Sequence, residues 1–338
     1  MKAIRVTNPG RYEDLALVDE PTPELGRRDV LIKVRACSLN FRDTIIAKGS
    51  YPGPLAHHVI PISDGAGDVV AVGSDVTRVT VGDRVTVNCS CDWVAGPNLA
   101  EYRSNSVGTT IDGMLAEFVR VEERGVIRLP DDFSYTDAAA LPCAAVSAWS
   151  ALHVAAPLSP GQTVLIQGTG GVSLFGLQIA RMFGARVLAL TSSEEKAQRL
   201  KAMGAAAVVN YRETPDWEDP ILELTGGKGV DKVIEIGGGG TINHSIACTR
   251  AGGEIGLVGY VAGMAGSLRP ITLQMRSVNL KPISIGPRIS FEALLTGMQN
   301  TGTRPVIDSV YGFSQFQDAL RHLESGSHFG KVVIDMEA

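Results

Sequence analysis

The sequence lacks both a disulfide framework and a recognisable metal-binding cysteine cluster. Its 338 residues include five cysteines, and only Cys89 and Cys91 lie close together, with no second pair nearby. An odd, scattered set of thiols in a chain of this length favours a reducing compartment. A single C-x-C pair is a poor zinc signature. We therefore expect a cytoplasmic protein with free thiols and no bound metal.

Long apolar runs and a strong charge bias are also missing. No stretch of about 18 apolar residues is present, so no membrane-spanning helix is expected. The first residues, MKAIRVTNPG, have the pattern of a strand and a polar turn and not of a signal peptide. The formal net charge of −5 is spread along the chain, which favours neither nucleic acid nor a membrane as partner. What remains is a globular chain with 38 glycines, long enough for two domains.

Residues 1–125 have the pattern of an all-β domain, a partly open barrel or a sandwich. Short alternating runs are separated by Pro, Gly and Asp turns. The loop at 89–113 is long and polar, which is typical of a functional loop or a lid. From Thr303, we expect a helix at Phe313–Leu323 and a last strand at Lys331–Asp335, packed on an earlier domain. The expected strands are Ala3–Val6, Leu15–Val18, Asp29–Ala36, Gly67–Val72, Arg84–Asn88 and Leu115–Val119.

The pattern changes at about Thr136. Asp137–Val154 is rich in Ala with Pro142 inside it, which predicts two short helices. Strands and helices then alternate, which is the sequence form of a parallel doubly wound sheet. The expected strands are 163–167, 186–190, 206–210, 231–236, 254–259 and Lys281–Gly286, and the expected helices are 171–183, 193–203, 217–225 and 241–250.

The turn after the first of these strands carries the nucleotide-binding signal. It has the form G-x-G-x-x-G with Gly168, Gly170 and, at the third position, Ser173. Glycines let the backbone approach a pyrophosphate, and the helix N-terminus offers it free N–H groups. We expect Gly170, Gly171 and Val172 to provide those groups. The alternative is an ordinary strand–helix turn. Gly237 and Gly259 follow two later strands at the edge where such sheets bind ligands.

Several segments resemble the medium-chain dehydrogenase/reductase superfamily over essentially the full length. The resemblance implies an α/β chain with a GroES-like β-rich catalytic domain at 1–125 and 295–338. This domain flanks a Rossmann cofactor-binding domain, a doubly wound parallel sheet, at 126–294. It also implies an active site in the cleft between the two domains and a homodimer. The matching segments are MKAIRV at the start, Val30–Asp43, Ile60–Gly73, Val81–Val85, the GTGGVS loop and Gly330–Val333.

Departures from the zinc-dependent members narrow the resemblance. Those members hold zinc with a cysteine, a histidine followed by glutamate, and a second cysteine. This sequence has Asn40 at the first place and Ser63-Asp64 at the second, and only Cys143 keeps a ligand type. Catalytic zinc needs three protein ligands, so no metal is expected. The run Asn40–Asp43 is typical of the zinc-independent quinone oxidoreductase-like and enoyl reductase-like branch.

This branch implies NADPH-dependent hydride delivery to a quinone or an α,β-unsaturated carbonyl. Without zinc, hydride addition to an activated C=C bond is easier than alcohol oxidation, since ordinary hydrogen bonds can hold the enolate. One alternative is a zinc-free NADP-dependent alcohol or aldehyde dehydrogenase. Another is a weakly catalytic protein that only binds NADPH.

The end of the second strand of the doubly wound sheet predicts NADPH as the cofactor. An NAD enzyme carries an acidic residue there, whereas this chain has Thr191, Ser192 and Ser193, then Lys196. Related NADPH reductases have a lysine and a tyrosine at the places of Lys196 and Tyr211. The alternative is that Ser192-x-x-Glu195 is a capping box and Lys196 a solvated helix residue.

The remaining candidate residues follow from the resemblance. Tyr51 matches the proton donor proposed for enoyl thioester reductases, with a simple rim contact as the alternative. Asn40 is expected to face the nicotinamide or the substrate carbonyl. Ser147 follows Cys143 by four residues and is expected to touch the nicotinamide from the same helix face. The segments that approach the cofactor in relatives contain Arg288, Phe329 and Lys331.

Overall fold

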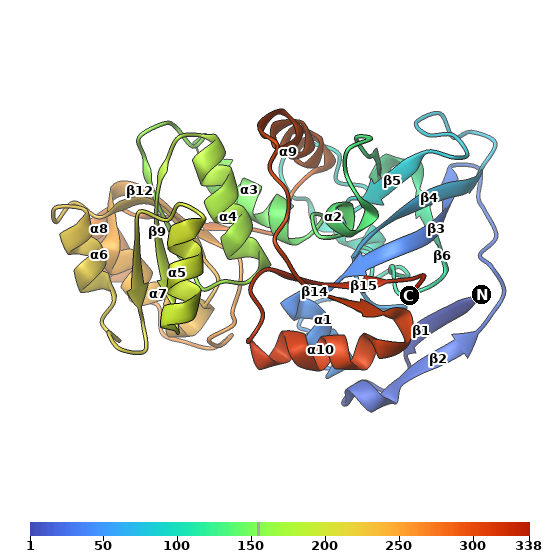
Figure 1. Cartoon of the computed structure of the whole chain (residues 1–338), viewed down its shortest axis with the longest axis horizontal. Coiled ribbons are helices and arrows are strands. Elements are labelled where there is room, and N and C mark those ends of the chain that lie inside the picture. Colours follow the sequence, from blue (N-terminus) through green and yellow to red (C-terminus); the bar gives the residue numbers. More distant parts are fainter. Residues whose placement is uncertain (154–155) are drawn as a thin grey trace. The chain divides into compact units, whose positions relative to one another are not determined.

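The computed structural model describes residues 1–153 and 156–338, and the chain forms two compact units (Figure 1). Unit 1 comprises Met1–Val146 and Gly286–Ala338, and unit 2 comprises Ser147–Ile285. The expected end of the second Ala-rich helix, Val154, lies outside the described residues. Within the described ranges, no helix combines the length and the apolar character that a bilayer crossing requires.

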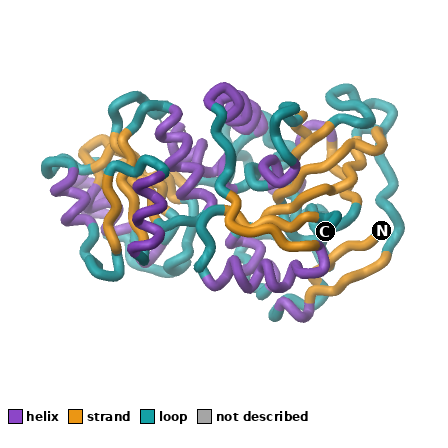
Figure 2. Tube along the Cα trace, in the orientation of Figure 1, coloured by secondary structure: helices purple, strands orange, loops and turns teal. Residues whose placement is uncertain are grey.

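Unit 2 is built on a six-stranded parallel sheet in the order β10-β9-β8-β11-β12-β13. In chain order this is 3-2-1-4-5-6, the doubly wound arrangement that the sequence predicts. Figure 2 shows these strands enclosed by helices. The strands are β8 (Thr163–Gln167), β9 (Arg186–Thr191), β10 (Ala207–Asn210), β11 (Val230–Glu235), β12 (Thr249–Leu257) and β13 (Asn279–Pro282). The helices of unit 2 are α4 (Gly171–Met182), α5 (Glu194–Ala202), α6 (Glu218–Leu224), α7 (Ile242–Cys248) and α8 (Pro270–Arg276).

The strand expected at Lys281–Gly286 is misplaced. β13 begins earlier and pairs with β12 only as far as Pro282, opposite Leu257. Ile285 then takes a φ of +60°, a left-handed conformation that an extended strand cannot contain. The prediction failed because it relied on apolar residues, and these continue after Lys281 beyond Pro282, where the hydrogen-bonded pairing with β12 ends.

Unit 1 is mainly β, as expected. Its larger sheet has the order β14-β15-β3-β4-β5-β7, with β6 pairing to β3, and a separate hairpin joins β1 and β2. The last strand, β15, pairs with β3 near the N-terminus, so the tail does pack on an earlier part of the chain, while β14 beside it was not expected. The strands are β1 (Lys2–Val6), β2 (Leu15–Asp19), β3 (Asp29–Ser38), β4 (Asp64–Val72), β5 (Arg84–Val87), β6 (Phe118–Glu122), β7 (Val126–Arg128), β14 (Ile307–Gly312) and β15 (Lys331–Asp335).

The helices of unit 1 were harder to predict. α10 follows a short 3-10 turn and lies beside β14 and β15 (Figure 1), close to the expected position. Two further helices of unit 1, α1 (Phe41–Ala47) and α9 (Arg288–Thr301), were not expected at all. The other helices are α2 (Tyr135–Ala139) and α10 (Phe316–Ser325), and α3 (Ala144–His153) runs from unit 1 into unit 2.

The division between the units differs from the expected one at two places. Residues 126–146 belong to unit 1, where Ala138 and Ala139 of α2 pack in a cluster with Ala66 and Val333. The stretch 286–294 also belongs to unit 1, because the N–H of Arg288 donates to the carbonyl of Trp93 at 2.9 Å. The sequence predicts both stretches in the cofactor-binding domain.

Candidate active site

In unit 2, the glycine turn has the geometry of an anion-binding loop. Gly168 has a φ of +73°, and its N–H donates to the carbonyl of Leu190 at 2.8 Å, which joins the turn to the end of β9. Gly170 is the N-cap of the 12-residue α4, which begins at Gly171. The first N–H groups of a helix have no acceptor within it. They are those of Gly170 at the N-cap and of Gly171, Val172 and Ser173, and the three expected donors are among them, so this turn fits a pyrophosphate.

Close packing behind the turn depends on a residue that the motif did not indicate. Ser173, at the third motif position, is fully buried, and its hydroxyl donates to the carbonyl of Gln167 at 2.5 Å. The closest approach of helix and strand is one turn later. A Cβ on Gly176 would lie 2.4 Å from the terminal methyl of Ile234 in β11. The α4 glycine that faces the isoleucine side chains of the sheet is therefore Gly176.

A buried carboxylate, which sequence reasoning missed, fixes the turn after β11. Glu235 accepts hydrogen bonds from the N–H of Gly237 at 2.7 Å and from the hydroxyl of Thr241 at 2.5 Å. It also accepts one from the Gln167 amide at 2.8 Å, and the other end of that amide holds the N–H of Ile236. The two turns at the switch point are thereby linked. The sequence did contain a signal for this contact, because Gln167 ends β8 and Glu235 ends the neighbouring parallel strand β11.

The glycines expected at this edge are both closely packed. A Cβ on Gly237 would lie 2.2 Å from the Thr241 hydroxyl oxygen, and one on Gly259 would lie 2.8 Å from the carbonyl oxygen of Ile236. Both positions therefore require glycine for steric reasons, and both lie beside the ends of β11 and β12.

The residues expected to select the cofactor gather at the ends of β9 and β10. The N–H of Tyr211 donates to the carbonyl of Thr191 at 3.0 Å, and the residue of Tyr211 is 41% exposed. Ser193 is the N-cap of α5, and its hydroxyl accepts from the N–H of Lys196 at 3.3 Å. The capping-box alternative at Ser192 and Glu195 is therefore wrong, because the helix begins one residue later than that pattern assumes.

In unit 1, a buried lysine is bonded to one of the predicted catalytic residues. Lys331 is 2% exposed, and its ammonium donates to the carbonyl of Leu39 at 2.6 Å and to Oδ1 of Asn40 at 2.7 Å. It lies 3.9 Å from a carboxylate oxygen of Asp64, which is fully buried. Asp64 also accepts from the Ser63 hydroxyl at 2.6 Å and from the N–H of Cys143 at 3.1 Å. The residues at the three zinc-ligand places therefore form one polar cluster with Lys331.

The Cys89 thiol is buried beside this cluster. Burial, a hydrogen bond with Cys143 and the charge of Asp64 together raise the pKa of Cys89 well above its usual value. The Cys89 thiol donates to Asp64 at 3.6 Å. Cys143 lies in the turn before α3 and not in the helix, so the expected helical relation to Ser147 does not hold. Ser147 itself is buried in α3.

Tyr51 lies near Arg42, a partly buried cation. Its side chain packs at the edge of the main core of unit 1 and over Gly53, where an added Cβ would meet the ring at 2.7 Å. Burial alone would lower the pKa of Arg42, but the nearby Cys143, Cys89, Asp43 and Tyr51 raise it above its usual range. Arg42 donates to the carbonyl of Val107 at 3.0 Å.

The backbone before the cluster is strained. Ile62 has a φ of +71°, which is rare for a β-branched residue. An added Cβ on Gly113 would lie 2.3 Å from the Ile62 carbonyl oxygen, and one on Gly108 would lie 2.7 Å from its carbonyl carbon. This conformation directs the chain into Ser63 and Asp64. Strain of this kind is found preferentially at functional sites.

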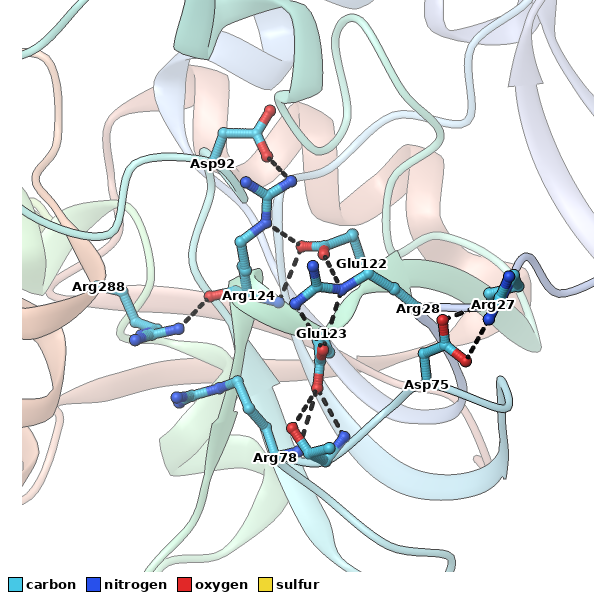
Figure 3. A network of polar contacts seen from close by, with 10 residues as sticks. Arg27, Arg28, Asp75, Arg78, Asp92, Glu122, Glu123, Arg124 and Arg288 are labelled. Atoms are coloured by element: carbon cyan, nitrogen blue, oxygen red, sulfur yellow. Dashed lines mark hydrogen bonds and ion pairs between the residues drawn. The ribbon is translucent and has the colours of Figure 1, made fainter.

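Arg288 and Phe329, which were expected near the cofactor, form hydrogen bonds within unit 1. Figure 3 shows the Arg288 guanidinium directed at the backbone of Arg124, to whose carbonyl it donates at 2.8 Å. Arg288 also pairs with Glu292 at 3.2 Å, and burial and the charge of Arg78 lower its pKa. Phe329 is 2% exposed, and its N–H donates to Asp308 at 2.8 Å.

Across residues 1–153 and 156–338, one group of three acidic, histidine or cysteine side chains lies close enough to share a metal ion. It consists of Asp216, Glu218 and His244 in unit 2, separate from the cluster around Lys331. Nδ1 of His244 is already hydrogen-bonded to Glu218 at 2.6 Å.

Comparisons with known proteins agree with this architecture. Residues 26–131 match the alcohol dehydrogenase GroES-like domain, and residues 171–300 match the zinc-binding dehydrogenase model. A zinc-type alcohol dehydrogenase-like protein of Schizosaccharomyces pombe is 37% identical over 96% of this chain and 98% of its own length. Human quinone oxidoreductase is 29% identical over 99% of this chain and 97% of its own.

Solved structures are equally similar. A putative alcohol dehydrogenase from Sinorhizobium meliloti 1021 has a TM-score of 0.92 and 36% identity, covering 99% of this chain and 98% of the other. An NAD-dependent alcohol dehydrogenase has a TM-score of 0.90 and 31% identity, with coverage of 99% and 100%. A mycobacterial protein complexed with NADPH has a TM-score of 0.83 and 29% identity, also with coverage of 99% and 100%.

The fold and the site thus define an oxidoreductase with a nicotinamide-cofactor sheet and a GroES-like domain. The chain belongs to the medium-chain dehydrogenase/reductase superfamily, in its quinone oxidoreductase-like branch.

Proposed function

We propose that this protein uses NADPH, without zinc, to reduce a quinone or a C=C bond conjugated to a carbonyl. The observation that carries the proposal is the Lys331 ammonium, bonded to Asn40 and 3.9 Å from Asp64. Asn40 stands at the first place that holds zinc in the zinc-dependent members, and Asp64 directly follows Ser63, which stands at the second.

The side chains at those places do not fit a zinc ion. Zinc in proteins prefers thiolate, imidazole and carboxylate ligands, and a catalytic site needs three of them. Here an amide, a hydroxyl and a thiol occupy the places, and the one nearby carboxylate, that of Asp64, already has hydrogen-bond partners and a buried ammonium beside it. A divalent cation there would be repelled by Lys331.

The cofactor site favours NADPH. Hydroxyl groups at Ser192 and Ser193, with Lys196 in the first turn of α5 and Tyr211 beside the end of β9, suit a 2′-phosphate. No acidic residue ends β9, where an NAD enzyme would hold the ribose. Glu194 and Glu195 are exposed. The mycobacterial neighbour complexed with NADPH supports the same choice.

The chain's own residues supply the rest of the chemistry. NADPH held at the glycine turn of unit 2 would supply a hydride to the carbon β to the carbonyl, and the electron pair of the C=C bond would move toward the carbonyl oxygen. Asn40 Nδ2 is buried and has no hydrogen-bond partner within the described residues, so it is available to donate to that oxygen. The Tyr51 phenol then gives its proton to the α carbon.

Steady-state assays with NADPH test this proposal. 1,4-Benzoquinone and cyclohex-2-en-1-one are the electron acceptors, and saturated alcohols with NADP⁺ test the dehydrogenase alternative. Turnover confined to alcohols would contradict the proposal. Tight NADPH binding with no turnover of any of these compounds would leave only the alternative of a cofactor-binding protein.

Replacing Tyr51 tests the proton donor. We expect Tyr51→Phe to lower kcat for cyclohexenone by about 100-fold, the usual contribution of a positioned acid, with an unchanged KM for NADPH. Tyr102→Phe removes another phenol hydroxyl of unit 1, from a ring that stacks on Trp93, and is the control. An unchanged kcat in Tyr51→Phe would exclude the donor role.

A further inference from the structure

The orientation of the Asn40 amide is decided by its neighbour. An ammonium group has only donors, so the amide atom that faces Lys331 at 2.7 Å must be the oxygen. The reverse orientation would place the NH₂ group, a donor, against the ammonium, also a donor, and would lose this hydrogen bond. Nδ2 therefore points away from Lys331, and it is the atom that lacks a partner within the described residues. A buried donor without a partner requires an explanation.

Both partners of this contact are held in place. Asn40 precedes α1, and its own N–H donates to Asp43 at 2.7 Å. Lys331 begins β15 directly after Gly330, which has a φ of +109° and on which a Cβ would lie 2.2 Å from the Val306 carbonyl oxygen. The buried carboxylate of Asp64, 3.9 Å from the ammonium, balances its charge.

We infer that Lys331 is a positioning residue: it fixes and polarises the Asn40 amide, so that Nδ2 donates to the substrate's carbonyl oxygen. This inference rests on the proposed function and assigns Lys331 a role different from the direct cofactor contact expected from the sequence. The ammonium withdraws electron density through Oδ1, which makes the N–H groups of the amide stronger donors. The Lys331 ammonium thereby stabilises charge on the substrate's carbonyl oxygen through the Asn40 amide that lies between them.

A double-mutant cycle on kcat tests the coupling. Asn40→Ala and Lys331→Met should each lower kcat for cyclohexenone by about 100-fold, as the loss of one oxyanion donor does. If Lys331 acts through Asn40, the double variant is no slower than Asn40→Ala alone, and KM for NADPH stays unchanged. Multiplied losses in the double variant would show that Lys331 acts independently and would overturn the inference.

Removing Lys331 leaves the Asp64 charge buried, which can prevent folding. The same cycle is therefore also measured in an Asp64→Asn background, where no carboxylate remains without a counter-charge. The expected result there is again no additional loss from Lys331→Met once Asn40 is alanine.

A measurement without substrate separates this inference from the proposed function. In protein labelled with ¹⁵N-asparagine, the Asn40 side-chain signal is the one that disappears in Asn40→Ala. We expect Lys331→Met/Asp64→Asn to shift this signal relative to Asp64→Asn, because the amide loses its charged donor. An unchanged signal overturns the inference whether or not the protein reduces enones. A shifted signal in a protein that reduces no quinone or enone supports the orientation and contradicts the proposed function.

Discussion

At the scale of single residues, Asp43 carries the clearest electrostatic cost. Burial raises its pKa from 3.8 to about 6, although the charge of Arg42 and the N–H of Asn40 oppose the shift. Between those two pH values the folded chain keeps a proton that the unfolded chain has released. The folded state then binds more protons, so the free energy of unfolding falls as the pH rises through this window.

Replacing Asp43 by asparagine, an uncharged amide, removes this decrease in the free energy of unfolding with rising pH. We expect the stability of Asp43→Asn relative to the wild type to increase from pH 4 to pH 7, by at most about 3 kcal/mol. Urea denaturation across this range measures it, and Asp131→Asn, which alters an exposed carboxyl, is the control. Parallel pH profiles for Asp43→Asn and the wild type would contradict the assignment.

Individual residues also show where sequence reasoning reached its limit. Asn40, Tyr51 and Lys331 could be named from their motifs, but the bond between Asn40 and Lys331 joins residues 291 positions apart. No local pattern reports such a contact. The left-handed conformation of Ile62 was equally hidden, because apolar β-branched residues normally predict extended backbone.

At the scale of elements, local signals predicted unit 2 well as far as β12, whereas α8 was not expected and the last strand was misplaced. The strand expected at 163–167 and the helix at 171–183 match β8 and α4 almost residue for residue, since a glycine turn and a glycine C-cap signal mark their ends. α1 was missed because Thr44, Ile45 and Ile46 resemble a strand. α9 was missed because its N-cap, Pro287, makes no side-chain capping bond.

The end of β9 is the element that decides between the two nicotinamide cofactors. Ser192→Asp places a carboxylate where a 2′-phosphate would lie and where an NAD enzyme holds its ribose. We expect the ratio of NADPH to NADH affinity to fall by at least about 10-fold. The carboxylate and the 2′-phosphate are like charges, and a repulsion of about 1.4 kcal/mol between them is enough for a tenfold loss. Fluorescence titration with both cofactors measures the ratio.

A matched control separates this effect from the added charge alone. Ser159→Asp adds the same charge at an exposed site before the opposite end of β8, and should leave the ratio unchanged. If Ser192→Asp also leaves the ratio unchanged, the 2′-phosphate is not recognised at the end of β9.

At the scale of the whole molecule, the sequence predicted both architectures but not where one ends and the other begins. Periodicity and glycine turns specify the parallel sheet, and the resemblance specifies the GroES-like unit. The boundaries at 146/147 and 285/286 depend on packing, such as that of Ala138 on Val333, which joins distant parts of the chain. Such contacts form only in the complete fold, so no local pattern in the sequence indicates them.

The central claim is that hydride reaches a carbon–carbon double bond with no metal ion involved. Enzyme dialysed against a chelator, with its zinc content measured, is given cyclohex-2-en-1-one and NADPH carrying deuterium in the transferable position. The account predicts undiminished turnover and cyclohexanone with deuterium on the carbon β to the carbonyl. Deuterium on the carbinol carbon of cyclohex-2-en-1-ol, or activity that is lost with the chelator and restored by zinc, would contradict it.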